Sequence, residues 1–176
     1  MPMPRRLTLT SFTLLTALLG APGQSDVVNW STLGDWDVAY YPNSKGCQAF
    51  AFFEENTAFF IGYDSNSNVV SLDVTVLDPR WTSIDPDQDY RVKVRFGNRD
   101  PWTLDMAGVR MDDYPGLNIM IDAESSKATL FIEEFQRESH MTWSYGDTDL
   151  GRYPLRGSKR AFNEVGTCQD SYNADE

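Results

Sequence analysis

The sequence predicts a mainly β domain, either a β-sandwich or an open barrel, with mostly antiparallel strands and one or two short helices, one near the C-terminus. Three observations predict this class. Short apolar runs recur along the chain, Gly, Pro, Asn and Asp clusters separate them, and several runs are rich in β-branched and aromatic residues. A helical spacing of apolar residues occurs only in the last third of the chain.

The first residues have the pattern of an export signal. Arg5 and Arg6 precede an apolar run over 7–19, and small residues follow it. This pattern predicts a cleavable signal peptide over 1–23. The alternative is a membrane anchor, but the run is shorter than the ~20 residues that span a bilayer. We therefore expect residues 24–176 to form a single β-rich domain with a polar C-terminal tail, periplasmic or secreted, without membrane insertion.

The first half of this expected domain contains four strand candidates. A cluster of Pro, Asn, Ser, Lys and Gly separates the first two, and Glu54-Glu55-Asn56 lies between the second and third with the spacing of a hairpin. The fourth candidate alternates and is rich in β-branched residues. These strands are expected over Trp36–Tyr41, Cys47–Phe53, Thr57–Tyr63 and Val69–Leu77.

A turn between the third and fourth candidates, Asp64–Asn68, has the D-x-N-x-N opening of a calcium loop. Val69 follows where that loop requires Gly, and Thr75 occupies the twelfth position where it requires Glu. A polar hairpin turn is the better interpretation, and calcium binding is the alternative. The chain has one His and two Cys, which excludes a centre built from several His and Cys ligands. We expect no metal and no cofactor.

The second half begins with the clearest strand, Tyr90–Phe96, in which aromatic and Val residues alternate with Arg and Lys. The apolar spacing then changes to the i, i+3, i+4, i+7 pattern of a helix, which Ser125 or Ser126 can cap and which extends to about Glu138. Gly157-Ser158 opens a short final helix. The other strand candidates are Trp102–Val109, Leu117–Ile121, Met141–Tyr145 and Leu150–Tyr153.

The two cysteines, Cys47 and Cys168, lie near opposite ends of the expected domain. In an exported protein they meet an oxidising environment, so we expect a disulfide that ties the last segment to an early strand. The alternative is a reactive cysteine. His140 is the only histidine and the only available base, and it is adjacent to neither cysteine.

Three short motifs resemble a group of small exported bacterial proteins that includes the invasion-associated locus B type. They are the Trp36-Asp37-Val38 strand, the Cys47-Gln48-Ala49 strand after a turn, and the closing Gly157-Ser158-x-x-Ala161…Cys168 helix. The resemblance covers the first and last thirds of the chain and implies a compact exported β-protein. It supplies no catalytic residues. This chain departs from the group because it has no second cysteine pair.

The charge of the chain limits its partners. It has 26 acidic against 15 basic residues, a net charge of −11, and loss of Arg5 and Arg6 with the signal makes it more negative. Nucleic acid is not an expected partner, because sequence-independent binding depends on neutralising phosphates with Lys and Arg. An acidic protein is instead steered towards a basic partner.

One stripe of basic residues, Arg91, Lys93 and Arg95, opposes this overall charge and shares one face of a strand. The stripe predicts either a weak binding site for an anionic ligand or a set of cross-strand ion pairs with acids such as Asp73. The surplus of acidic residues favours the ion pairs.

The hairpin over 47–63 carries apolar residues on both of its faces. Phe50, Phe52 and Phe60 belong to one face, and small and aliphatic residues with Phe59 belong to the other. Such a hairpin is covered on its second side, here by the helix with Phe131 and Phe135, or it presents an interface to a partner. In the second case Phe50, Phe52 and Phe60 are the interface residues.

No convincing catalytic set is present, so an enzyme is uncertain and not favoured. The leading hypothesis is an exported, non-enzymatic binding or accessory protein that recognises another protein, with an undetermined oligomeric state. One alternative is a small anionic-ligand carrier that uses Arg91, Lys93 and Arg95. The other, less favoured, is a carboxylate-based hydrolase, which rests on the abundance of acidic residues and tryptophans. The adjacent acidic pairs Glu54-Glu55, Asp112-Asp113 and Glu133-Glu134 are better interpreted as solvated charge, because this chemistry needs two carboxyl groups that face each other across a cleft.

Overall fold

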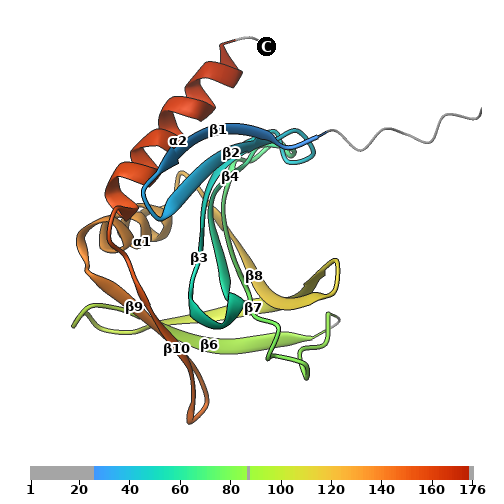
Figure 1. The fold of residues 1–176 in the computed structure, drawn as a ribbon, viewed down its shortest axis with the longest axis vertical. Coiled ribbons are helices and arrows are strands. Elements are labelled where there is room, and N and C mark those ends of the chain that lie inside the picture. Colours follow the sequence, from blue (N-terminus) through green and yellow to red (C-terminus); the bar gives the residue numbers. More distant parts are fainter. Residues whose placement is uncertain (1–25, 87, 175–176) are drawn as a thin grey trace, which may run out of the picture.

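A computed structural model describes residues 26–86 and 88–174 (Figure 1). The signal peptide predicted over 1–23 lies outside the described residues. The helical elements are α1 (Ser126–Arg137), α2 (Ser158–Asn173) and a 3₁₀ turn, η1 (Glu54–Asn56). The strands are β1 (Val28–Leu33), β2 (Trp36–Tyr41), β3 (Gly46–Phe52), β4 (Ala58–Asp64), β5 (Ser71–Leu77), β6 (Asp89–Phe96), β7 (Trp102–Met111), β8 (Tyr114–Asp122), β9 (His140–Tyr145) and β10 (Thr148–Pro154).

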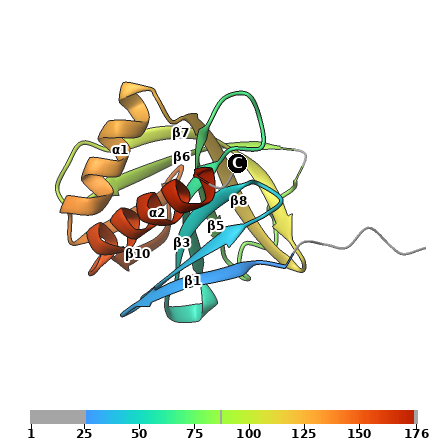
Figure 2. The same ribbon diagram turned by 90° about the horizontal axis from the view of Figure 1, so that it is seen from above.

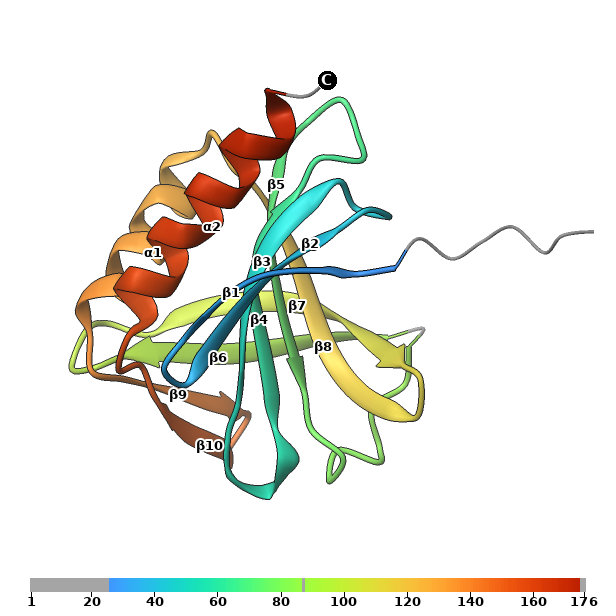
Figure 3. The same ribbon diagram turned by 45° about the horizontal axis from the view of Figure 1, so that its top comes forward.

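The ten strands form one antiparallel sheet in the order β1-β2-β3-β4-β5-β8-β7-β6-β9-β10. The sheet bends strongly, so that β3 and β4 run across the direction of β6, but it does not close, and β1 and β10 are its two edges (Figures 1 and 3). The mainly antiparallel β class predicted from the sequence is therefore confirmed. Of the two predicted architectures, the structure has the open, bent sheet, since the described strands do not divide into two stacked sheets.

Helix α1 forms where the sequence predicts it. The Ser125 hydroxyl accepts a hydrogen bond from the Ala128 backbone N–H at 3.2 Å, which caps the first turn. Phe131 and Phe135 are fully buried against the sheet, and the ring centroid of Phe135 lies 5.8 Å from that of Phe59 on β4. The helical spacing thus places one apolar stripe on one face of the sheet.

Helix α2 lies beside α1 on the same face and contacts β1 to β4 (Figures 1 and 2). Cys168 of α2 forms the predicted disulfide with Cys47 of β3, with their Cα atoms 6.0 Å apart. Neither helix is long and apolar enough to cross a membrane.

The predicted polar tail after Cys168 is instead a continuation of α2 through Asn173. The side-chain oxygen of Gln169 accepts a hydrogen bond from the Cys47 backbone N–H at 2.9 Å, and its nitrogen donates to the Lys45 carbonyl at 3.1 Å. The Tyr172 ring stacks on Tyr40, with centroids 3.6 Å apart. Tertiary contacts hold these polar residues in the helix. The composition of the segment does not reveal such contacts, so by itself it suggested a tail.

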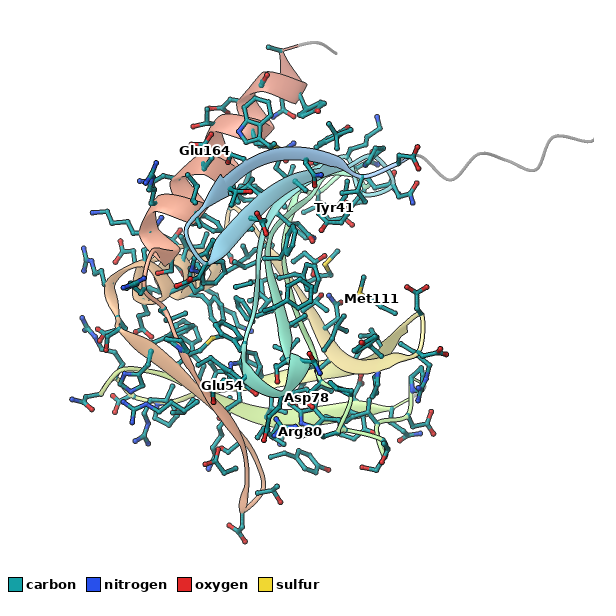
Figure 4. The ribbon with its side chains drawn as sticks, in the orientation of Figure 1. Tyr41, Glu54, Asp78, Arg80, Met111 and Glu164 are labelled. Atoms are coloured by element: carbon teal, nitrogen blue, oxygen red, sulfur yellow. A yellow bond between two sulfur atoms is a disulfide. The ribbon has the colours of Figure 1, made fainter. Side chains whose placement is uncertain are left out.

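Strand β1 was not expected from the sequence. It is an edge strand, it pairs only with β2, and its residues are largely exposed, so it lacks a clear alternating pattern. The Trp30 indole N–H donates a hydrogen bond to the Glu164 carboxylate of α2 at 2.8 Å (Figure 4). β1 is therefore held by its pairing and by a helix far away in sequence.

Candidate functional site

The face of the sheet opposite the helices, which we call the outer face, is uncovered over β3, β4, β5, β8 and β7 within the described residues. In a strand, alternate side chains lie on the same face, and cross-strand partners share it. By this register the outer face carries a group of apolar side chains, and Phe52 is the most exposed of them at 68%. The group consists of Phe50, Phe52, Phe60, Val109, Met111, Tyr114 and Met120.

A helix covers only one face of the apolar hairpin. The face with Phe59 is buried under α1, as the helix pattern suggested. The other face, with the predicted interface residues Phe50, Phe52 and Phe60, is not covered by either described helix. The Phe50 ring packs edge-on against Phe52, with centroids 6.1 Å apart, and stacks on Phe60 at 5.6 Å. The three rings therefore form one continuous aromatic surface.

A small hollow of about 260 Å³, which we call the Asp73 pocket, lies in the outer face beside this surface. Tyr41, at the end of β2, and Met111, at the end of β7, lie on its opposite sides (Figure 4). Phe60 and Val109 complete the apolar part of its wall. The polar part consists of Gln48, Asp73, Thr75 and Asn118, together with Asn43 and Ser44 of the turn before β3.

Three neutral side chains hold the Asp73 carboxylate. Its Oδ2 accepts a hydrogen bond from Gln48 Nε2 at 2.7 Å, and its Oδ1 accepts from Asn118 Nδ2 at 2.6 Å and from Thr75 Oγ1 at 3.0 Å. No Lys or Arg among the described residues forms an ion pair with Asp73. The carboxylate is therefore oriented by dipoles and not neutralised by a cation.

A glycine makes this arrangement possible. Gln48 and Asp73 lie on β3 and β5, and Gly62 of β4 is the cross-strand partner of both. A Cβ at Gly62 would lie 2.5 Å from the Gln48 Cα and 2.8 Å from its Cγ, closer than such atoms approach. The missing side chain thus leaves the space through which Gln48 reaches across β4 to Asp73.

Burial and neighbouring groups shift two pKa values in the pocket. Desolvation raises the pKa of Asp73 above its ordinary value of 3.8, the hydrogen bonds from Thr75, Gln48 and Asn118 oppose this shift, and the charge of Asp64 adds to it. Burial, and secondarily the charge of Asp73, raises the pKa of Tyr41 to about 12. The Tyr41 phenol is therefore protonated at neutral pH, next to a carboxylate whose charge is partly desolvated.

The basic stripe of β6 lies on the same face of the sheet but outside the pocket, because Arg91 is the cross-strand partner of Asp105 on β7. Arg91, Lys93 and Arg95 are exposed on β6, as the alternation predicted, and Arg91 Nε pairs with Asp105 Oδ1 at 2.8 Å. The suggested pairing with Asp73 is wrong, because β8 and β7 separate β5 from β6 in the sheet. Within the described part of the chain the stripe does not line the Asp73 pocket.

A larger hollow, of about 650 Å³, lies between η1 and β10. The fully buried Asp78 beneath it accepts hydrogen bonds from Thr57 Oγ1 at 2.8 Å and from Arg80 Nε at 2.9 Å (Figure 4). Arg80 also pairs with Glu55. Arg80 thus neutralises the carboxylates of Asp78 and Glu55 in a structural network. Glu55 is therefore not available as a catalytic partner for its neighbour Glu54, which lies at the rim of the hollow.

Two other features of the sequence, the calcium-like turn and His140, have simple structural roles. The backbone N–H of Asn66 donates to the Asp64 carboxylate at 2.9 Å, so the aspartate of the calcium-like pattern closes a turn. The Ser139 hydroxyl lies 3.0 Å from His140 Nδ1, and no carboxylate of the described residues hydrogen-bonds the ring. Neither the turn at Asp64 nor the Ser139–His140 contact forms a better candidate site than the Asp73 pocket.

The pocket residues were not selected from the sequence as a site. Two signals could have found them: Asp73 is the single charge in the middle of an otherwise uncharged strand, and Gly62 interrupts the neighbouring strand. Comparisons with protein-family models, with curated proteins and with solved structures found no match for this chain. The interpretation of the outer face therefore rests on its geometry alone.

The raised pKa of Asp73 predicts a pH-dependent effect of Asp73→Asn. The folded protein binds this proton more tightly than the unfolded chain, so the ionisation of Asp73 lowers stability as pH rises from the ordinary pKa through the folded one. The free energy of unfolding of the variant, relative to the wild type, should therefore increase as pH rises through and above the ordinary pKa of 3.8. Urea unfolding at several pH values measures this difference, and a difference that is constant or decreases with pH would contradict the assignment.

Proposed function

We propose that this chain is an exported, non-enzymatic binding protein that recognises a basic protein through its outer face. The observation that carries the proposal is the uncovered aromatic surface next to a carboxylate that forms no ion pair with a Lys or Arg of the described residues. Apolar residues that are exposed together, and not singly, are typical of sites where proteins meet. Interfaces of this kind combine aromatic and Met anchors with a few polar groups.

The outer face has both features of such an interface, namely aromatic and Met anchors and a few polar groups. Phe50, Phe52 and Phe60 supply large rigid rings, and Met111 and Met120 supply flexible side chains that are 46% and 45% exposed. Such anchors contribute most of the binding energy when a partner removes them from water. Gln48, Asp73 and their partners would supply the polar contacts that orient the partner.

Charge supports a basic partner. The net charge of the chain is −11, and the exposed turn between β7 and β8, next to the outer face, carries Asp112 and Asp113. A field of this sign accelerates encounter with a cationic protein and suppresses encounter with an acidic one. The disulfide supports an oxidising compartment, which fits the export expected from the sequence and the resemblance to small exported β-proteins.

The two alternatives have weaker support. An anionic-ligand carrier would use Arg91, Lys93 and Arg95, but Arg91 is paired with Asp105 and the stripe is flat and exposed. A hydrolase would need two carboxylates that face one another across a cleft. Glu55 pairs with Arg80, Glu133 pairs with Arg137, and Glu134 accepts a hydrogen bond from the Trp102 indole.

A partner-capture experiment tests the proposal. The oxidised mature protein is used to capture proteins from envelope and culture fractions of the cells that make it, and quantitative mass spectrometry identifies what is enriched. We expect one enriched basic protein, whose affinity for the purified bait falls at least tenfold in Phe52→Asp, since one buried aromatic anchor contributes about 2 kcal/mol or more.

Leu130→Asp provides the matched control, because Leu130 is also exposed but lies on α1, on the side of the helices. This variant should bind like the wild type. An empty capture, or equal losses in both variants, would refute the use of the outer face. Binding that weakens steeply with added salt would support the cationic character of the partner.

A further inference from the structure

We propose that the Asp73 pocket receives the ammonium group of one lysine side chain of the partner. This inference rests on the proposed function and adds the chemistry of its central contact. The lysine would lie with its charged end at Asp73 and its alkyl stem against the apolar wall, in the middle of the outer face.

The charge of the pocket selects a cation. Asp73 is largely removed from water, and three neutral donors and no described cation compensate it. A desolvated carboxylate gains most from an incoming positive charge, which replaces lost hydration and adds a charge-assisted hydrogen bond. An anionic ligand would be repelled by the same group, and a purely apolar one would bury the charge without compensation.

Hydrogen-bond capacity favours lysine over arginine. An ionised carboxylate offers about four acceptor positions, and Gln48, Thr75 and Asn118 already use three of those on Asp73. One position is left for a ligand. An ammonium needs a single acceptor and directs its other protons to neighbours such as the Tyr41 oxygen or the amide oxygens of Gln48 and Asn118. A guanidinium fork needs two parallel acceptors.

The size and wall of the pocket fit a single long side chain. Its volume of about 260 Å³ lies below the ~300–1,000 Å³ of pockets that enclose drug-sized ligands. Phe60, Val109 and Met111 line it with apolar surface, along which a lysine stem can be buried while its ammonium reaches Asp73. The aromatic surface that lies beside the pocket indicates that the cation belongs to a protein and not to a free amine.

Nuclear magnetic resonance titration with a small probe tests the pocket without the partner. The probe is Nα-acetyl-lysine N-methylamide, with the arginine and norleucine analogues and n-butylamine as comparisons. We expect saturable shifts of the side-chain amide signals of Gln48 and Asn118 with the lysine probe and weaker binding of the arginine analogue. n-Butylamine should also bind more weakly than the lysine probe. Norleucine, which has the stem without the charge, should cause no saturable shift.

Two variants test the role of the pocket residues. Asp73→Asn should weaken binding of the lysine probe at least tenfold, whereas Asp37→Asn, which removes a carboxylate from the same face outside the pocket, should leave it unchanged. Val109→Trp narrows the hollow and keeps Asp73, so it should also weaken binding at least tenfold. Equal binding of norleucine and lysine, equal or stronger binding of n-butylamine, or binding that is unchanged in Asp73→Asn, would overturn the inference.

The outcomes for the pocket and for the proposed function are separable. If the captured partner depends on Phe52 but not on Asp73, and the lysine probe does not bind, the outer face binds a protein and the lysine pocket is wrong. If the lysine probe binds with the expected dependence on Asp73 and no partner is captured, the protein-binding proposal fails at the capture step, and the pocket is a site for alkylammonium groups.

Discussion

Loss of the Cys47–Cys168 disulfide is expected to lower the free energy of unfolding by about 2–5 kcal/mol. The bond closes a loop with a sequence separation of 121, so its removal gives the unfolded chain a large increase in conformational freedom. It also joins α2 to β3 at a point where both cysteines are fully buried. Without the disulfide, only the remaining contacts of α2 would keep Gln169 and Tyr172 in place against the sheet.

Urea unfolding of the wild type with and without reductant measures this effect, and the Cys47→Ala/Cys168→Ala double variant provides the control. Reductant should destabilise the wild type and leave the double variant unchanged. The variant should also unfold at lower urea concentration than the oxidised wild type. A loss below about 1 kcal/mol, outside the usual range for native disulfides, would show that the helix is held by packing and not by the cross-link.

Replacement of Phe135 by alanine is expected to cost about 3–5 kcal/mol of stability. Phe135 is fully buried on α1 and packs edge-on against Trp36 of β2, with centroids 5.4 Å apart. It also contacts Phe59 of β4 and Phe162 of α2, at 5.8 and 6.3 Å. The ring therefore lies where both helices and two strands meet, and alanine would leave a cavity that none of them can fill easily.

Thermal and urea unfolding of Phe135→Ala and Leu130→Ala compare a buried and an exposed position of the same helix. Leu130 is 51% exposed, so its replacement should change stability by no more than about 0.5 kcal/mol. Near-ultraviolet circular dichroism should also lose intensity in Phe135→Ala, because the Trp36 environment loosens. Similar losses of stability in the two variants would contradict the assigned core.

The fold could be predicted from the sequence where a local pattern is compatible with only one secondary structure and one buried face. In β6, alternation places Val92 and Val94 in the core and Arg91 and Lys93 in water, because side chains of a strand point to opposite faces. In α1, the spacing of Ala128, Phe131 and Phe135 defines a buried stripe. A local pattern is weakest at an edge strand such as β1, which has neighbours on one side only.

The candidate site was only partly predictable. The hairpin pattern identified Phe50, Phe52 and Phe60 as residues of one face, but it did not say which face the helices would cover. The alternation of basic residues in β6 also suggested an ion pair with Asp73 that the strand order rules out. The strand order brings Gln48, Asp73 and Asn118 together from three different strands, and order depends on how the whole sheet packs.

The sequence by itself determined the mainly β class, the two helices, the cysteine pair and the division of the clearest strands into buried and exposed faces. These features depend on period and composition within short segments, which a single strand or helix expresses locally. Only the tertiary structure decided the strand order, the uncovered outer face and the carboxylate that lies in it without an ion pair to any described Lys or Arg. They depend on contacts such as that of Gln48 with Asp73 across Gly62, which form only when distant segments pack into one sheet.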